Sequence, residues 1–122
     1  MSTYRAAHID EIAAEKWPYW APIRHHFDIK TFGINAWRGA EGDEVIKRHD
    51  ESESGDPELY FVLSGSALLT VGGEECKAPA GTLVWIEDPK AERVAVAKET
   101  NTVVVSIGGG KPSGWDTGYL EG

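Results

Sequence analysis

The chain has 122 residues, 41% of them hydrophobic, and a formal net charge of −8 at neutral pH. This length suits one domain with a modest core. The acidic balance argues against nucleic acid and anionic membrane surfaces as partners, because both require clustered Lys and Arg.

Several further features of the sequence lead us to expect a cytoplasmic protein. No apolar stretch approaches the roughly 20 residues that span a bilayer. The start of the chain, Met-Ser-Thr-Tyr-Arg, lacks the apolar core of a secretory signal. The single cysteine, Cys76, excludes an internal disulfide. It lies among charged residues with no histidine beside it, as an ordinary free thiol does.

Residues 1–24 are predicted to form an irregular N-terminal arm. Residues 9–15 could make one or two helical turns, but Pro18 and Pro22 prevent a long helix. Three aromatic residues cluster around these prolines: Trp17, Tyr19 and Trp20. We expect them to pack onto the main body; the alternative is that the arm crosses to a second subunit.

The segment from residue 25 to residue 107 is typical of an all-β barrel or sandwich, with short strands between Gly and Pro turns. The predicted strands cover 25–37, 44–49, 58–64, 67–71, 74–78, 82–86, 93–97 and 102–107. Residues 50–57 are polar and are predicted to form a hairpin loop. The tail, residues 108–122, is Gly-rich and polar and is expected to be flexible.

The strand that begins at Glu58 raises the question of function. Alternate residues of a strand share a face, so Glu58, Tyr60 and Val62 lie on the same side. A carboxylate on a core-facing side is costly unless it is paired. The partner of Glu58 should therefore indicate what this face of the barrel does.

Two spacings resemble the sequence motifs of the cupin family. Six residues separate Glu58 from Gly65, and five residues separate Gly73 from the Pro79-Ala80-Gly81 turn. The chain is therefore identified by resemblance, over residues 27–107, as a single-domain cupin, a double-stranded β-helix or jelly-roll barrel. Two departures are visible: Val84 stands at the family's second-motif histidine position, and the segment from His49 to Glu58 is about two residues too long.

The resemblance implies a reduced divalent-metal site for Mn, Fe, Ni or Zn. One imidazole and two carboxylates would supply it: His49, Glu51 and Glu58. His49 and Glu51 are two residues apart and point the same way in an extended segment, and a hairpin would bring Glu58 beside them. Val84 offers no ligand, so water or substrate must complete the coordination. Glu58 and His49 are also the candidate catalytic residues.

A small-molecule ligand is expected to bind beside this site. The candidate ligand-binding residues are Tyr60, Trp37, Val84 and Arg93. Arg93 could meet a substrate carboxylate, or it could pair only with Glu87 and Glu92. Trp85 should face outward, into a sheet or dimer contact. The cupin resemblance implies a homodimer.

Two other hypotheses remain open from the sequence. In the first, the barrel is metal-free and binds an organic ligand, as a sensor module or as an acid–base enzyme of epimerase or cyclase type using His49 and Glu58. If residues 48–51 are instead a solvated end of the hairpin, Glu58 could pair with Arg48, Arg93 or His49. In the second, the domain is structural and binds a partner without pocket chemistry. No nucleophile elbow, phosphate loop, Cys-x-x-Cys or HExxH motif is present.

Overall fold

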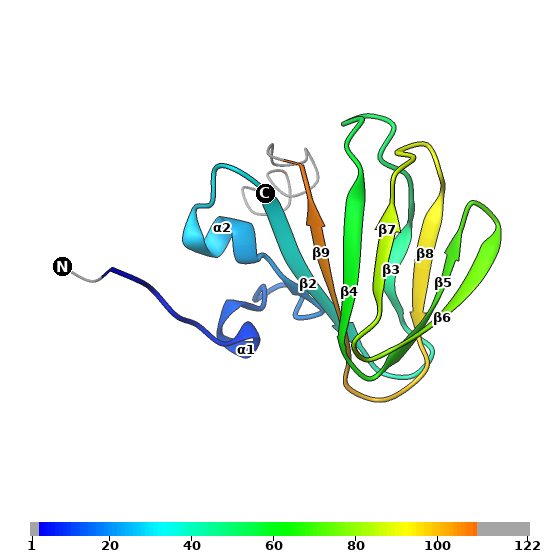
Figure 1. Ribbon diagram of the computed structural model, residues 1–122. Coiled ribbons are helices and arrows are strands. Elements are labelled where there is room, and N and C mark those ends of the chain that lie inside the picture. The colour runs from blue at the N-terminus through cyan, green and yellow to red at the C-terminus, as the bar shows by residue number, and fades with distance from the viewer. Residues whose placement is uncertain (1–2, 110–122) are drawn as a thin grey trace.

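The computed structural model describes residues 3–109, which form two antiparallel sheets (Figure 1). The strand order is β1-β2-β9-β4-β7 in the five-stranded sheet and β3-β8-β5-β6 in the four-stranded sheet. The helices are α1 (Ile9–Ile12) and α2 (Ile23–Phe27), and the strands are β1 (Trp20–Ala21), β2 (Gly33–Gly39), β3 (Glu44–His49), β4 (Glu58–Ser64), β5 (Ser66–Val71), β6 (Glu74–Pro79), β7 (Leu83–Ile86), β8 (Arg93–Ala97) and β9 (Thr102–Gly108). The all-β, jelly-roll prediction is confirmed.

The core lies between the two sheets and is filled mainly by every second residue of the strands; the exception is β3, where the adjacent Val45 and Ile46 are both buried at a register shift. Tyr60 and Val62 of β4 are buried, whereas Leu63 on the opposite face is exposed. Ala95 and Ala97 of β8 are buried in the facing sheet. These residues belong to one apolar cluster with Val45, Ile46, Ala67, Leu69, Ala78, Ile86 and Val104. The alternation that predicted the strands is thus the alternation that fills the core.

The N-terminal arm packs on the body of the molecule, as predicted, and α1 lies within the expected helical turns. Trp20 of β1 is fully buried and stacks on Trp37, with ring centroids 5.9 Å apart. Trp17 meets the same Trp37 ring edge-on. The Tyr19 side chain is exposed, so two of the three aromatic residues around the prolines, the tryptophans, pack on the body as predicted. A smaller apolar cluster joins the arm and α2 to the outside of the five-stranded sheet: Ile12, Ala21 and Ala36, with Ala7, Ile9, Ile23, Phe27, Val103 and Val105 around them.

The predicted strand over residues 25–37 is wrong in its first half. Residues 23–27 form α2, and the strand begins only at Gly33. Asp28 takes a left-handed conformation (φ 57°), and its N–H bonds the carbonyls of Arg24 and His25. This local cap closes the helix, and it outweighs the apolar alternation of the sequence. His25 and His26 lie exposed on α2.

Residues 50–57 do not form a hairpin loop. β3 belongs to the four-stranded sheet and β4 to the five-stranded sheet, so this segment crosses from one sheet to the other. Its Glu51 N–H donates to the carbonyl of Pro89, 2.7 Å away, in the loop that precedes β8. The predicted neighbourhood of His49, Glu51 and Glu58 therefore arises by a route that the sequence did not predict.

The outer face of β4 and β7 remains apolar and exposed. Leu63, Leu83 and Trp85 are 47%, 61% and 57% exposed, respectively. Trp85 faces outward as predicted. β7 is also the last strand of its sheet, so one of its edges has no neighbour among the described strands. A patch of this kind on an edge strand is suited to contact with another chain.

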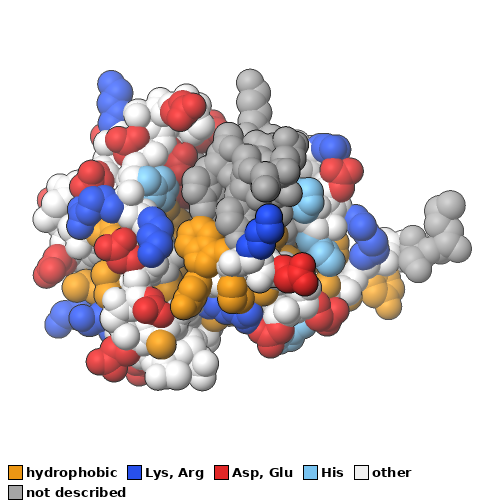
Figure 2. Space-filling view, turned by 180° about the vertical axis from the view of Figure 1, so that it is seen from behind, with side chains coloured by type: hydrophobic (Ala, Val, Ile, Leu, Met, Phe, Trp, Pro, Cys, Tyr) orange, Lys and Arg blue, Asp and Glu red, His pale blue; other side chains and the backbone are white. Residues whose placement is uncertain are grey.

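Figure 2 shows acidic and basic side chains intermingled over one face, with hydrophobic side chains between them. Among residues 3–109, no helix has the length and apolar character needed to cross a bilayer.

Gly65 is the turn position that tolerates a side chain least. Its φ is +73°, and an added Cβ would lie 2.4 Å from Thr102 Oγ1 and 2.7 Å from Thr102 Cα. Thr102 is buried, and its hydroxyl donates to the carbonyls of Ser66 and Glu99, so it cannot easily move. Gly73 also has a positive φ, +85°, but nothing lies within 4 Å of its added Cβ.

We therefore expect Gly65→Ala to destabilise the fold far more than Gly73→Ala. The left-handed backbone costs roughly 1–2 kcal/mol at either position, and the clash at Gly65 adds about 1–3 kcal/mol more. Urea unfolding of both variants beside the wild type measures the difference. Equal losses at the two positions would contradict the close approach of Gly65 to Thr102.

Candidate functional site

The candidate site lies at one end of the barrel, where strands of both sheets begin or end. His49 is the last residue of β3 and is the cross-strand partner of Arg93, the first residue of β8. Glu58 is the first residue of β4, in the other sheet. Glu51 follows β3 by two residues. The site is thus built from two sheets that face each other, and loops 50–57 and 87–92 border it (Figure 1).

The predicted metal ligands are brought together. One donor atom each of His49, Glu51 and Glu58 lies within 4.8 Å of the other two. His49 Nε2 is 2.9 Å from Glu51 Oε1 and 3.9 Å from Glu58 Oε1. The other ring nitrogen, Nδ1, is 2.7 Å from the carbonyl of Lys47, which orients the imidazole. This carbonyl accepts only from a protonated Nδ1, so Nε2 is available as a ligand in the neutral imidazole.

Exposure falls steadily across the site. The side chains of His49, Glu51 and Glu58 are 36%, 26% and 15% exposed, and that of Arg93 is 0% exposed. Solvent therefore reaches the site from the side of His49, and Arg93 closes its inner end. A ligand entering the site would meet His49 and Glu51 first.

Arg93 is the partner of Glu58. Its Nη1 donates to Glu58 Oε1 at 3.0 Å, while Nε and Nη2 donate to the carbonyls of Ala91 and Asp88. The expected pairing of Arg93 with Glu92 or Glu87 is therefore wrong; Glu92 instead pairs with Arg48 on the surface. The period-two pattern that places Ala95 and Ala97 inward also places Arg93 inward. That signal was available in the sequence.

The burial and pairing of these groups shift their proton affinities. Desolvation raises the pKa of Glu58 above its ordinary value, and the charge of Glu51 adds to this, although Tyr60, His49 and Arg93 act in the opposite direction. The hydrogen bond from His49 lowers the pKa of Glu51. Burial depresses the pKa of His49, but the bond to Glu51 and the neighbouring acids prevail and raise it. The protonation of each of these three groups therefore depends on the charge of the other two.

Tyr60 and Val84 lie further into the barrel than Glu58, by two residues along the strand, and Trp37 lies further in again. Tyr60 pairs across the sheet with Val84 on β7 and with Ser106 on β9. The buried Tyr60 hydroxyl makes no hydrogen bond of normal geometry to residues 3–109. Burial, and then the charge of Glu58, raise the pKa of this phenol well above 10. The hydroxyl nevertheless lies beside the Glu58 carboxylate and interacts with it, and this interaction lowers the pKa of Glu58.

Trp37 is not placed beside Glu58. It pairs with Val104, which pairs with Val62, so it belongs to a row four residues along from Glu58. Four residues of strand correspond to roughly 13 Å. The indole Nε1 donates to Ser106 Oγ at 2.9 Å. Ser106, a buried polar residue of the barrel interior that sequence reasoning missed, thus links Trp37 to the row of Tyr60. Its inward alternation on β9 was the signal.

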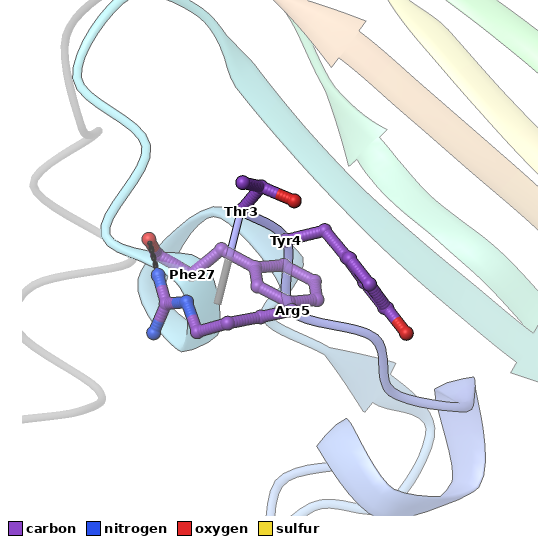
Figure 3. Close-up of a pocket in the computed structure, with 4 residues that line it drawn as sticks. All are labelled: Thr3, Tyr4, Arg5 and Phe27. Carbon is purple, nitrogen blue, oxygen red and sulfur yellow. Dashed lines mark hydrogen bonds between the residues drawn. The ribbon is translucent and has the colours of Figure 1, made fainter. Parts of the chain in front are cut away.

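The N-terminal arm and α2 form a pocket of their own. It is lined by Thr3, Tyr4 and Arg5 of the arm and by Phe27 of α2 (Figure 3). Arg5 donates to the Phe27 carbonyl and lies over its ring. The cation is thus engaged by Phe27, and the acids of the metal cluster do not line this pocket.

Comparison with known proteins supports the fold. No protein-family model and no curated protein matches the chain. Solved structures do. A cupin protein from Bacteroides fragilis is 19% identical, with a TM-score of 0.70 over 93% of this chain and 89% of its own. This chain has the cupin fold.

Two further cupin-fold neighbours are more distant. An RmlC-like cupin from Shewanella frigidimarina is 15% identical, with a TM-score of 0.59 over 70% of this chain and 72% of its own. A predicted oxalate decarboxylase from Thermotoga maritima is 15% identical, with a TM-score of 0.57 over 72% and 74%. At these identities the likeness gives the fold and leaves the reaction open.

The donor set of the site fits a divalent ion. An imidazole nitrogen and two carboxylate oxygens suit Mn, Fe, Ni or Zn, and the solvent-facing side leaves room for further ligands. Val84 contributes no donor atom, so the protein offers three ligands. The arginine on Glu58 is the feature of the site that opposes a cation.

The raised pKa of His49 predicts a pH dependence of stability. A folded-state pKa above the unfolded value of 6.5 gives stabilisation that is present below pH 6.5 and is lost as pH rises through the folded value. With a chelator present, His49→Asn should therefore cost more at about pH 6 than at about pH 9, by less than roughly 1 kcal/mol because the imidazole is partly exposed.

Chemical unfolding at the two pH values measures this difference. In a Glu51→Gln background the hydrogen bond that raises the pKa of His49 is weakened, so most of the pH dependence should disappear. A cost of His49→Asn that grows toward high pH would contradict the assigned direction.

Proposed function

We propose that this protein is a small-molecule-binding protein whose barrel-end site holds a divalent metal ion through His49, Glu51 and Glu58. The observation that supports it is the convergence of one imidazole and two carboxylates within 4.8 Å at a partly exposed end of the barrel. His49 and Glu58 come from different sheets and Glu51 from the segment between them, and the fold brings the three together.

The chain's own residues have distinct parts in this proposal. The Lys47 carbonyl orients His49, and His49 and Glu51 lie on the solvent side, where a ligand enters. Tyr60 offers its buried hydroxyl, which lies beside Glu58, to a ligand atom at the inner side of the site. A divalent ion, when bound, would polarise an oxygen of that ligand. Among neighbours of this fold one is named a predicted oxalate decarboxylase.

Metal titration tests the proposal. Tag-free protein stripped with chelator should bind Mn²⁺ or Zn²⁺ with a stoichiometry of about one. His49→Ala and Glu51→Gln should each weaken binding by at least roughly ten-fold. Glu53→Gln is the matched control, because Glu53 is an exposed acid of the same segment outside the cluster, and it should bind like the wild type.

Isothermal titration calorimetry gives both stoichiometry and affinity. Substoichiometric binding, or binding that is unchanged in His49→Ala, would remove the metal site. The exposed control separates a defined site from general attraction of cations to an acidic protein.

One observation favours a second function, a metal-free site for an organic ligand. Glu58 already has a cationic partner in Arg93, and His49 already bonds Glu51. His49 and Glu58, 3.9 Å apart, could then serve as an acid–base pair beside Tyr60. A thermal shift produced by a metabolite in the presence of chelator, and lost in Glu58→Gln, would support this function over the first.

We further propose that a second copy of this chain covers the apolar face of Leu63, Leu83 and Trp85. The support is that the patch continues to the unpaired edge of β7, so two copies related by a twofold axis could align these edges and bury both patches.

This arrangement predicts a homodimer that depends on β7. The double variant Leu83→Lys/Trp85→Lys should behave as a monomer, because it places four like charges in the twofold contact. Tyr19→Lys, another exposed aromatic on the arm, is the control and should remain dimeric. Light scattering after size-exclusion chromatography measures the mass; a monomeric wild type would refute the proposal.

A further inference from the structure

Arg93 is an unusual residue for a metal site, a fully buried cation at its inner end. Two of its three hydrogen bonds go to backbone carbonyls, 3.0 Å to Ala91 and 3.2 Å to Asp88. These carbonyls belong to the loop that leads into β8. The guanidinium is therefore held by its own strand and loop, independently of Glu58. A cation that binds at the site would therefore not displace the guanidinium.

The third hydrogen bond of Arg93 goes to the deepest of the three candidate metal ligands. Nη1 lies 3.0 Å from Glu58 Oε1, the oxygen that also lies 3.9 Å from His49 Nε2. A metal ion bound by Glu58 would share that carboxylate with the guanidinium. Two cations on one buried carboxylate repel each other strongly, because the surrounding protein screens them less than water does.

The two more exposed ligands, His49 and Glu51, are also already bonded to a protein group. His49 Nε2, the nitrogen available to a metal, is bonded to Glu51 Oε1 at 2.9 Å. Each of the three donor residues thus has an internal partner in the ion-free arrangement. Metal binding would release the Nε2 proton of His49 to solvent and replace the His49–Glu51 bond by two metal bonds, but the Arg93 charge would stay in place. Among the described residues in contact with the three ligands, Arg93 is therefore the one that most opposes binding of the ion.

We propose that Arg93 is an internal competitor for Glu58, a positioning residue that keeps the divalent-metal affinity of the His49–Glu51–Glu58 site low. The inference rests on the proposed metal function and adds a cause for its strength. A site restrained in this way would exchange its ion readily and would be loaded only at high metal concentration. Removing the charge of Arg93 should release Glu58 to the metal.

The test is the metal affinity of charge-altered variants, measured on chelator-stripped, tag-free protein by calorimetry with Mn²⁺ and with Zn²⁺. Arg93→Gln keeps an amide donor for the Asp88 or Ala91 carbonyl and removes the charge, so its Kd should fall at least about ten-fold. Arg93→Lys keeps the charge and should stay near the wild-type Kd. Arg48→Gln is the matched control, because Arg48 makes an exposed pair with Glu92; its Kd should not change.

A merely structural role of Arg93 would weaken metal binding on substitution, so tighter binding is a readout that such a role cannot produce. If Arg93→Gln fails to fold in chelator, its recovery is followed during refolding with increasing Mn²⁺. Recovery at Mn²⁺ concentrations below the wild-type Kd supports the competition. No recovery at saturating Mn²⁺ overturns it.

The outcomes distinguish this inference from the proposed function. A wild type that binds metal, with an Arg93→Gln variant that binds equally or more weakly, overturns the role of Arg93 and leaves the metal site standing. Absence of binding in both proteins overturns the metal site and the competition together. Binding in Arg93→Gln alone supports the competition in its strongest form, because the native site is then blocked by its own arginine.

Discussion

The pair of Glu58 and Arg93 joins the two sheets at the end of the barrel, and the arrangement of the site depends on it. Glu58 begins a strand of one sheet and Arg93 a strand of the other, and their side chains meet 3.0 Å apart in the interior. A carboxylate on the core-facing side of β4 would be costly alone. The buried guanidinium offsets that cost, and its bonds to Asp88 and Ala91 tie the preceding loop to the same point.

The same pair decides what chemistry is open to the site. Arg93 pairs with Glu58 and Glu51 pairs with His49, so each of the three candidate ligands already has a partner within the ion-free site. A metal ion must enter against a fixed positive charge, whereas an organic ligand could meet an acid–base pair that is already in position. The cupin fold accommodates both arrangements, so the fold cannot choose between them. The charges of Arg93, Glu58, His49 and Glu51 determine which of the two arrangements this site favours.

Much of the strand pattern could be predicted from the sequence, and the errors have physical causes. From Glu44 onward, apolar alternation and glycine turns placed each strand to within about two residues. The failure over residues 25–32 came from a helix cap, which alternation does not report. The hairpin assigned to residues 50–57 failed because the pairing of strands is a choice among distant partners, and local sequence does not encode which sheet a strand joins.

By itself, the sequence determined the all-β class and the shared facing of Glu58, Tyr60 and Val62, because both depend on a period of two. It also named the acids and the imidazole of the site. Only the tertiary structure decided that Arg93 is the partner of Glu58, that Glu51 bonds His49 and that Trp37 lies too deep to share their row. Those facts depend on how two sheets align across the core, and side-chain neighbours across that gap have no fixed spacing along the chain.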